Sequence, residues 1–198
     1  MSHLDDRLAS DPVRVRANVS SVVPRRRRWK AIGLGIVVFG LVADLWSKHA
    51  MQGLLGMSPD RPHGSLYRIE VIDGLLAWAG NWNAGVTFGM AAGLGEPILW
   101  FTMLAGFGIL AWLLVTRSQS RVLHVALAMI LSGALGNLYD RWRFGMVRDF
   151  IDVYWKDHHW HTFNVADSLI VVGVSLILWL ELFGRHGAAT AAPRAGPP

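Results

Sequence analysis

Long apolar segments dominate this chain and restrict it to a membrane. Pro97–Val115 contains 19 residues without one ionisable side chain. A helix of about 20 apolar residues is long enough to cross the hydrocarbon core of a bilayer. Ala31–Trp46, Val122–Tyr139 and Asp167–Phe183 are nearly as long and almost as poor in charge. The sequence therefore predicts an all-α polytopic membrane protein with four transmembrane helices.

The composition agrees with this fold class. Hydrophobic residues make up 53% of the 198 residues and charged residues only 17%, whereas a soluble domain carries about 25% charged residues. The chain has no Cys, which excludes disulfides, thiolate metal sites and cysteine nucleophiles. Many of its ten Trp stand beside the ends of apolar segments, as aromatic residues do at a membrane interface.

Basic residues indicate the orientation. The formal net charge is +5, and the run Arg25–Arg28 directly precedes the first apolar segment. Such a run holds a helix end at the anionic cytoplasmic leaflet, so we expect no nucleic-acid partner. Arg117, Arg121 and Arg185 fall on the same side of a four-pass chain. Both termini are therefore predicted to be cytoplasmic. The connection between the third and fourth helices is an exception to the rule, with Arg141, Arg143, Arg148 and Lys156.

The chain divides into a membrane domain and two tails. Residues 29–185 form the predicted four-span domain. Residues 1–28 are polar and aperiodic at first and then basic, and we expect them to be a disordered cytoplasmic tail. Residues 186–198 are rich in Ala, Gly and Pro and are expected to be a second disordered cytoplasmic tail.

Two segments are predicted to lie outside. Residues 50–95, between the first and second helices, contain two β-rich runs, Leu66–Ile72 and Leu75–Trp82, on either side of Asp73-Gly74. An Asp-Gly pair between such runs is a strong hairpin signal. We therefore expect a small extracytoplasmic β-rich region there. Residues 142–166, between the third and fourth helices, are rich in aromatic side chains and are predicted to be an outer loop.

Polar side chains gather at one end of the predicted helices. With a cytoplasmic N-terminus the first and third helices run outward and the fourth runs inward, so three outer ends lie at one depth. The side chains at that depth are Asp44, Lys48, Asn137, Asp140, Arg141, Asn164 and Asp167, with Asp149 and Asp152 in the adjoining loop. Ionisable groups at membrane depth are costly and normally face a bundle interior, which makes this set a candidate functional site.

Carboxyl groups are the reactive groups of this set. Two Asp side chains brought close together share a proton, because both cannot ionise cheaply. One can then activate water while the other, protonated, polarises a scissile carbonyl group. The candidates are Asp44, Asp140, Asp149, Asp152 and Asp167. The residues alone do not choose among the possible pairs.

Other chemistries fit less well. Ser132 has no evident base partner. The run Asp157–His161 contains three His, but adjacent His residues do not share a helical face and a zinc site would need further ligands. We therefore expect no metal and no cofactor. The main alternative is a small proton-coupled transporter or channel. That function predicts a polar path across the bilayer, whereas the inner halves of the segments are almost wholly apolar, with His124 and Glu181 as exceptions.

Five short blocks resemble the lipoprotein signal peptidases, the type II signal peptidases of bacteria. The blocks follow one another in the order DLWSK (Asp44–Lys48), NAGVTFG (Asn83–Gly89), SGALGNLYDR (Ser132–Arg141), GMVRDFIDVYW (Gly145–Trp155) and FNVADS (Phe163–Ser168). The resemblance extends from Trp29 to Phe183. Any one block is weak, but all five in order on a four-span chain are specific.

The resemblance implies roles for individual residues. It makes Asp149 and Asp167 the catalytic dyad of an aspartic endopeptidase. Residues that bind substrate or shape the site are then Asp44, Lys48, Asn83, Asn137, Arg141 and Asn164, and we expect Phe88 near the site, in a segment that could close over the substrate.

The resemblance also implies the substrate and the location. The partners would be a prolipoprotein whose Cys carries a diacylglyceryl group, cleaved before that Cys, and the surrounding membrane lipid. The protein would lie in the bacterial cytoplasmic (inner) membrane, with its active site near the outer leaflet.

Overall fold

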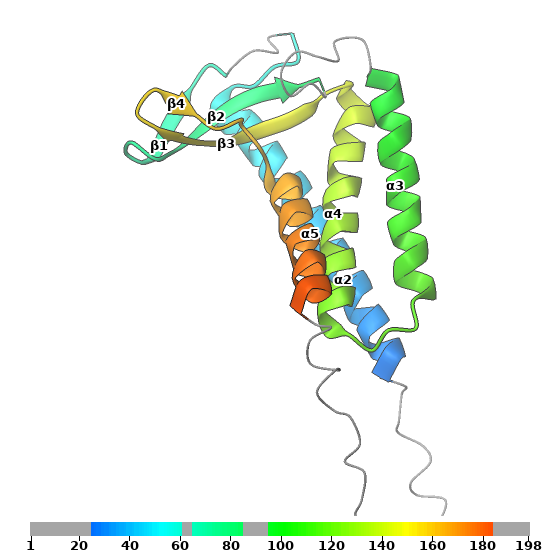
Figure 1. Ribbon diagram of the computed structural model, residues 1–198. Helices are drawn as coiled ribbons and strands as arrows, with labels where there is room; N and C mark the ends of the chain where they lie inside the picture. Colours follow the sequence, from blue (N-terminus) through cyan, green and yellow to red (C-terminus); the bar gives the residue numbers. More distant parts are fainter. Residues whose placement is uncertain (1–24, 61–64, 85–94, 184–198) are drawn as a thin grey trace, which may run out of the picture.

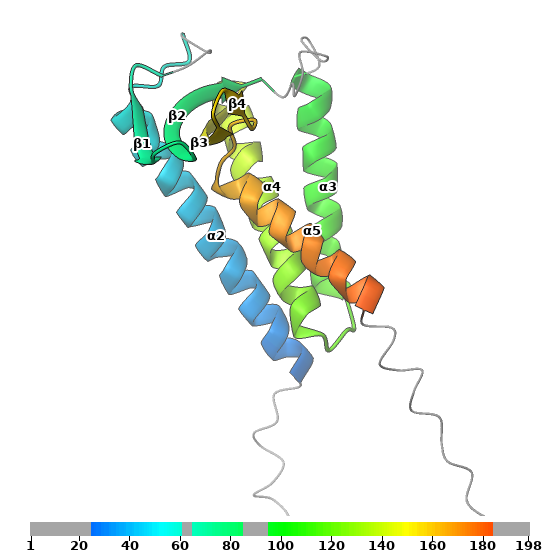
Figure 2. The same cartoon turned by 60° about the vertical axis from the view of Figure 1, so that its left-hand side comes forward.

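In the part of the chain that the structure describes, four long helices stand beside one another, and a small β-sheet lies across one end of them (Figure 1, Figure 2). The computed structural model describes residues 25–60, 65–84 and 95–183. The two predicted tails therefore lie almost entirely outside the described residues, and Phe88 lies outside them as well.

All four predicted apolar segments are helical. The helices are α2 (Arg25–Leu55), α3 (Gly95–Val115), α4 (Arg121–Phe144) and α5 (Val165–Phe183). Among the described residues, α2, α4 and α5 are long and apolar enough to cross a membrane, while α3 offers a shorter apolar stretch, Trp100–Val115. The basic run before the first apolar segment belongs to α2, because that helix begins at Arg25.

The sheet has four antiparallel strands in the order β1-β2-β3-β4. The strands are β1 (Arg68–Ile72), β2 (Leu76–Asn83), β3 (Val147–Trp155) and β4 (His158–His159). The predicted hairpin at Asp73-Gly74 is confirmed: it joins β1 to β2, with a 3.0 Å bond from the Leu75 N–H to the Ile72 carbonyl. Gly74 has φ +73°, a left-handed conformation that glycine adopts without strain.

The prediction of an outer loop over residues 142–166 is wrong, because β3 and β4 lie there. β3 pairs with β2 through Asn81↔Asp149 and Asn83↔Val147. The strand contains the apolar and aromatic residues expected of β structure, but Asp149 and Asp152 interrupt their alternation. The β-rich region is therefore built from both segments that join helices, and it is not confined to residues 50–95.

The sheet packs on the end of α2. Leu55, the last residue of α2, and Met57, two residues after it, form one buried cluster with Trp82 of β2 and Phe150 of β3. Burial of large apolar side chains is the main favourable term in holding such elements together. This cluster fixes β3, and with it Asp149, relative to the helix that carries Asp44 and Lys48.

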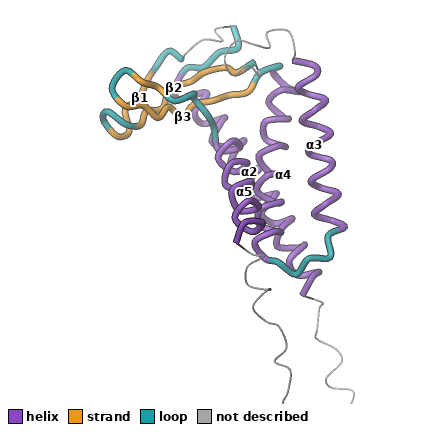
Figure 3. Tube along the Cα trace, in the orientation of Figure 1, coloured by secondary structure: helices purple, strands orange, loops and turns teal. Residues whose placement is uncertain are grey.

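α4 is the central helix of the bundle. It contacts α2, α3 and α5, whereas α3 has little contact with α2 (Figure 3). Glycines permit the close approach: a Cβ at Gly133 would lie 2.3 Å from the Ala166 carbonyl oxygen, and one at Gly136 would lie 2.2 Å from Oδ2 of Asp44. Small residues at helix interfaces serve the same purpose in other membrane bundles.

We predict that Gly133→Ala destabilises the protein by about 1–3 kcal/mol, because the added methyl group meets the backbone of α5 rather than a side chain that can move. The measurement is the thermal unfolding temperature in detergent. The matched control is Gly108→Ala in α3, where an added Cβ meets nothing within 4 Å. Equal unfolding temperatures for the two variants would contradict this account of the α4–α5 contact.

Candidate active site

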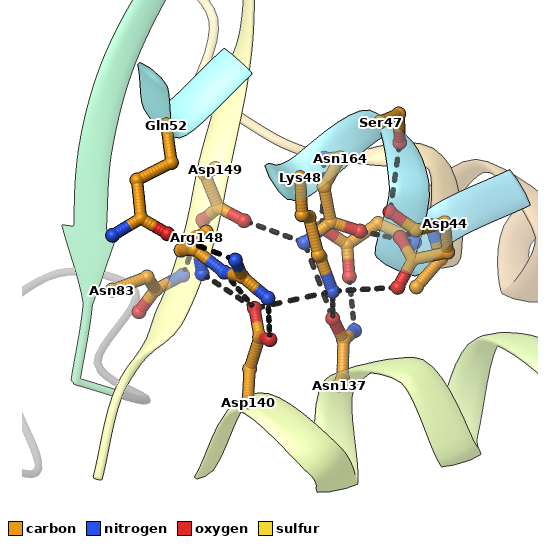
Figure 4. A network of polar contacts seen from close by, with 12 residues as sticks. Asp44, Ser47, Lys48, Gln52, Asn83, Asn137, Asp140, Arg148, Asp149 and Asn164 are labelled. Carbon is orange, nitrogen blue, oxygen red and sulfur yellow. Dashed lines mark hydrogen bonds and ion pairs between the residues drawn. The ribbon is translucent and has the colours of Figure 1, made fainter. Parts of the chain in front are cut away.

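A network of polar side chains lies where the sheet meets the helices. It draws on α2, α4, β2, β3 and the start of α5, and several of its members have no exposed surface. The residues drawn in Figure 4 include Asp44, Lys48, Asn83, Asn137, Asp140, Arg148, Asp149 and Asn164. Most of the polar residues predicted to share one depth are therefore brought together.

The start of α5 is a reciprocal capping arrangement. The Asp167 N–H donates to Oδ1 of Asn164 at 2.9 Å, and the Asn164 N–H donates to Oδ2 of Asp167 at 3.2 Å. The N–H of Ala166, also in the first turn of α5, donates to Oδ1 of Asp44 at 2.8 Å. Two carboxylates thus sit at the positive end of the helix dipole, where negative charge is stabilised.

Lys48 is buried at the centre of the network, with no exposed surface. Its ammonium group lies 2.8 Å from Oδ2 of Asp44 and 3.4 Å from Oδ2 of Asp140. It also donates to Oδ1 of Asn137 at 2.9 Å. An ammonium group can only donate, so this bond turns the amide nitrogen of Asn137 away from Lys48. That nitrogen donates to Oδ1 of Asp167 at 2.7 Å.

Asp149 is held by two amides. Its Oδ1 accepts from Nδ2 of Asn164 at 2.7 Å, and its Oδ2 accepts from Nδ2 of Asn83 at 3.0 Å. Only 1% of the residue is exposed. Burial, and next the charge of Asp167, raise the pKa of Asp149 to about 7 against the lowering effect of the two amides. A carboxyl group with that pKa can carry or release a proton near neutral pH.

Asn164 connects the two carboxyl groups. Its side chain bonds both to Asp149 and to the backbone of Asp167, and its Nδ2 also reaches Oδ1 of Asn137 at 3.1 Å. Asp167 is only partly buried and lines a cavity of about 510 Å³ beside α5. The pair therefore joins a fully buried carboxyl group to one that borders an open cavity.

The charges of the cluster nearly balance. Four carboxyl groups (Asp44, Asp140, Asp149 and Asp167) face three basic groups (Lys48, Arg141 and Arg148). One proton shared between Asp149 and Asp167 makes the cluster neutral. Buried charge without a partner costs several kcal/mol, so the cluster as a whole favours the singly protonated pair.

Arg148 is a site residue that the sequence analysis did not identify. Its guanidinium group donates to both oxygens of Asp140, at 2.6 and 3.2 Å, and to Oε1 of Gln52 at 3.0 Å. The Arg148 N–H also donates to Oδ2 of Asp140, at 3.0 Å. The sequence pattern indicates Arg148 only as a basic residue on the outer side, where few basic residues are expected. The available signal was Asp140, a carboxyl group at membrane depth that needs a basic partner.

Among the described residues, two of those predicted form no hydrogen bond with the network. Arg141 is partly buried, and its charge interacts with those of Asp167 and Asp149, but no hydrogen bond or ion pair of its guanidinium group occurs within residues 25–60, 65–84 and 95–183. Asp152 belongs to another cluster on the sheet, where it contacts Arg68 and His159. Arg68 reaches it across β2, where the small residues Ala77 and Ala79 occupy the positions between them.

The His-rich segment forms the turn before β4 and the strand itself. His159 approaches Oδ2 of Asp152 at 3.0 Å and stacks on Tyr154 with a centroid distance of 5.1 Å. In the part of the chain that the structure describes, no three His, Asp or Glu side chains are arranged to hold a metal ion.

Comparison with known proteins identifies the family. The family model described as signal peptidase (SPase) II matches residues 36–183. The chain belongs to the signal peptidase II family. It is therefore a peptidase of that family, and this excludes the transporter alternative.

Several relatives carry the name lipoprotein signal peptidase. The protein of Sulfurihydrogenibium sp. (strain YO3AOP1) is 40% identical over 164 residues, covering 79% of this chain and 94% of its own. The protein of Solibacter usitatus is 38% identical over 172 residues, covering 83% and 98%. A solved structure of a bacterial membrane enzyme aligns with a TM-score of 0.67 at 25% identity, covering 85% of this chain and 95% of its own.

Lys48→Met should destabilise the signal peptidase by about 3–5 kcal/mol, because it leaves the buried carboxylates of Asp44 and Asp140 without their shared cation. The measurement is the unfolding temperature in detergent. His49→Met is the matched control, since His49 is the next residue of α2 and is exposed. A Lys48→Met variant as stable as the control would show that the ammonium group is not needed at the centre of the network.

The raised pKa of Asp149 predicts a pH-dependent effect of Asp149→Asn on stability. Between about pH 4 and pH 7 the folded protein retains a proton that the unfolded chain releases, so the stability of the wild type falls as the pH rises through this range. Asp149→Asn has no carboxyl group to titrate at this position, so its stability does not fall in this way. The unfolding temperature of the variant should exceed that of the wild type at about pH 8 and match it at about pH 4.

The control for this measurement is Asp73→Asn, which removes an exposed carboxyl group from the hairpin turn. Its unfolding temperature should follow the wild type at every pH. An Asp149→Asn variant that also runs parallel to the wild type would contradict the raised pKa of Asp149.

Proposed function

We propose that this protein removes signal peptides from diacylglyceryl-modified prolipoproteins by cleaving the chain before the lipidated Cys. The observation that carries this proposal is that Asn164 bonds to both Asp149 and Asp167, whose charges interact, in a member of a peptidase family. The name of the relatives, lipoprotein signal peptidase, supports the substrate class.

The two carboxyl groups differ in a way that assigns their first roles. Asp167 accepts N–H bonds from Asn137 and Asn164 at the start of a helix, and it lines the cavity from which water can reach it. Asp149 is more deeply buried and has its pKa raised to about 7. In the resting enzyme Asp167 is therefore the base and Asp149 is the acid.

The reaction follows from these states. Asp167 takes a proton from water as the water oxygen attacks the carbonyl carbon before the Cys, and Asp149 gives its proton to the carbonyl oxygen. The tetrahedral intermediate then breaks. Asp167 passes its proton to the leaving amine, the C–N bond is cleaved, and Asp149 recovers its proton from the oxygen as the carbonyl group reforms. Each carboxyl group ends as it began.

The remaining site residues support this chemistry. Asn137 and Asn164 orient the dyad, Asn83 holds Asp149, and Asp44 and Lys48 anchor the start of α5 and Asn137. Arg141 is free to bind a backbone carbonyl of the substrate, because its charge lies near the dyad and its guanidinium group makes no hydrogen bond within the described ranges. Phe88 remains a prediction outside those ranges.

The proposed orientation places the sheet and the dyad at the outer leaflet of the bacterial inner membrane, with α3 as a fourth span and both termini in the cytoplasm. A lipid-modified Cys is held at the bilayer surface by its acyl chains. The sheet lies across one end of the helices (Figure 1). The polar network lies at that end, and many large apolar side chains are exposed along the helices. The scissile bond and the dyad would therefore meet at the same depth.

The test is cleavage of a diacylglyceryl-modified lipobox peptide by the purified protein. Asp149→Asn and Asp167→Asn should each lower kcat by at least about 10³-fold, because each removes one half of a shared acid–base function. Asp157→Asn is the matched control, an exposed Asp on the same side of the molecule. Wild-type turnover by either dyad variant would refute the assignment.

The dependence on pH and on metal gives a second test of the mechanism. Turnover should be bell-shaped in pH, because one carboxyl group must be ionised and the other protonated. A chelator should leave turnover unchanged. A flat profile into strongly acidic solution, or loss of activity on chelation, would contradict a two-carboxyl mechanism.

A further inference from the structure

α5 presents two different sides along its length. One side, with Ala166, Ile170 and Gly173, packs against α4: these residues meet Gly133 or Ile130 of that helix. The opposite side makes no such contact. Val171, Leu178 and Leu182 are 63%, 56% and 62% exposed, so an apolar face runs the length of the helix.

The exposed face has the spacing of a helix-packing surface. Ser168, Val171, Ser175, Leu178 and Leu182 follow one another at intervals of three, four, three and four residues, and we call these five residues the α5 seam. The 3–4 alternation is the one that places successive side chains against a second helix.

The two serines of the seam are compatible with an apolar partner. The hydroxyl of Ser168 donates to the Asn164 carbonyl at 3.0 Å, and that of Ser175 donates to the Val171 carbonyl at 2.8 Å. Both hydroxyl groups are therefore satisfied within α5, and the small side chains leave room for a close neighbour.

The α5 seam is continuous with the candidate active site. The cavity of about 510 Å³ beside α5 is lined by Asp167 at its catalytic end and by Ser168, Val171 and Val172 along the helix. Trp160 and Phe163 form its remaining apolar walls. A substrate that lies in this cavity is in contact with the dyad and with the first turns of the seam.

The length of the seam matches one part of the proposed substrate. From Asp167 to Leu182 the helix rises by about 22 Å at 1.5 Å per residue. The apolar region of a signal peptide has about 7–15 residues, which as a helix is about 10–22 Å long. The cavity itself is comparable in volume to about one turn of a helix 10–12 Å wide, a turn of about 400–600 Å³.

We propose that the α5 seam is the docking surface for the apolar helix of the signal peptide. The substrate helix lies antiparallel to α5, with its C-terminal end in the cavity at Asp167 and the rest along Val171, Ser175 and Leu178. This inference rests on the proposed function and adds the place where the substrate is held before cleavage. Contact along the seam sets the depth at which the scissile bond meets the dyad.

Photocrosslinking tests which molecule lies on the seam. The chain contains no Cys, so Ser175→Cys supplies a unique thiol for a benzophenone label, in an Asp149→Asn background that leaves the substrate uncut. Ser175 lies about 12 Å below Asp167 along the helix. Illumination in vesicles with lipidated prolipoprotein should link the label to the signal peptide about eight residues before the scissile bond, as mapped by mass spectrometry.

The matched control is Val174→Cys with the same label. Val174 is exposed on α5, at 42%, but lies outside the seam. It should label membrane lipid and at least about 10-fold less signal peptide. Equal labelling from both positions, or labelling of the diacylglyceryl chains from Ser175→Cys, would overturn the proposal.

A kinetic experiment separates this inference from the proposed function. Ser175→Trp should raise KM at least about 10-fold for a full prolipoprotein. It should leave a short diacylglyceryl peptide without the apolar helix unaffected, because Ser175 does not line the cavity at Asp167. Val174→Trp should match the wild type on both substrates. If Ser175→Trp impairs both substrates equally, the seam does not dock the helix. Failure of the wild type to cut the short peptide would count against the proposed function instead.

Discussion

The buried ammonium group of Lys48 is the interaction on which the rest of the site depends. It neutralises Asp44 and Asp140 and fixes the direction of the Asn137 amide. Asp44 in turn binds the start of α5, and Asp140 binds Arg148 beside Asp149. A single cation on α2 thus positions groups on α4, α5 and β3, at a depth where every unpaired charge would be costly.

The network also explains why the two carboxyl groups are unequal. Asp149 lies in a strand and is almost completely buried, whereas Asp167 lies in the first turn of a helix and borders a cavity. Their surroundings therefore suit them to different roles, although the two residues are chemically identical. The asymmetry comes from the elements that carry them, a strand in one case and a helix cap in the other.

Much of this arrangement could be predicted from the sequence, and the missing parts have physical reasons. The helices follow from apolar runs and the hairpin from Asp73-Gly74, both of which are local signals. β3 was missed because Asp149 and Asp152 interrupt its apolar pattern. The role of Arg148 was missed because it depends on a partner, Asp140, that only the fold brings near. The residues alone also left the choice among five Asp residues open.

The capping arrangement at α5 joins the stability of the fold to the chemistry. Asn164 and Asp167 complete each other's backbone bonds; Asn164 also holds Asp149, and Asp167 is the other member of the proposed dyad. A substitution at either position therefore alters the first turn of the helix and the reacting group together. Resistance to an inhibitor that binds both residues should therefore arise rarely. A substitution of Asn164 or Asp167 that weakens binding of the inhibitor would also impair the enzyme.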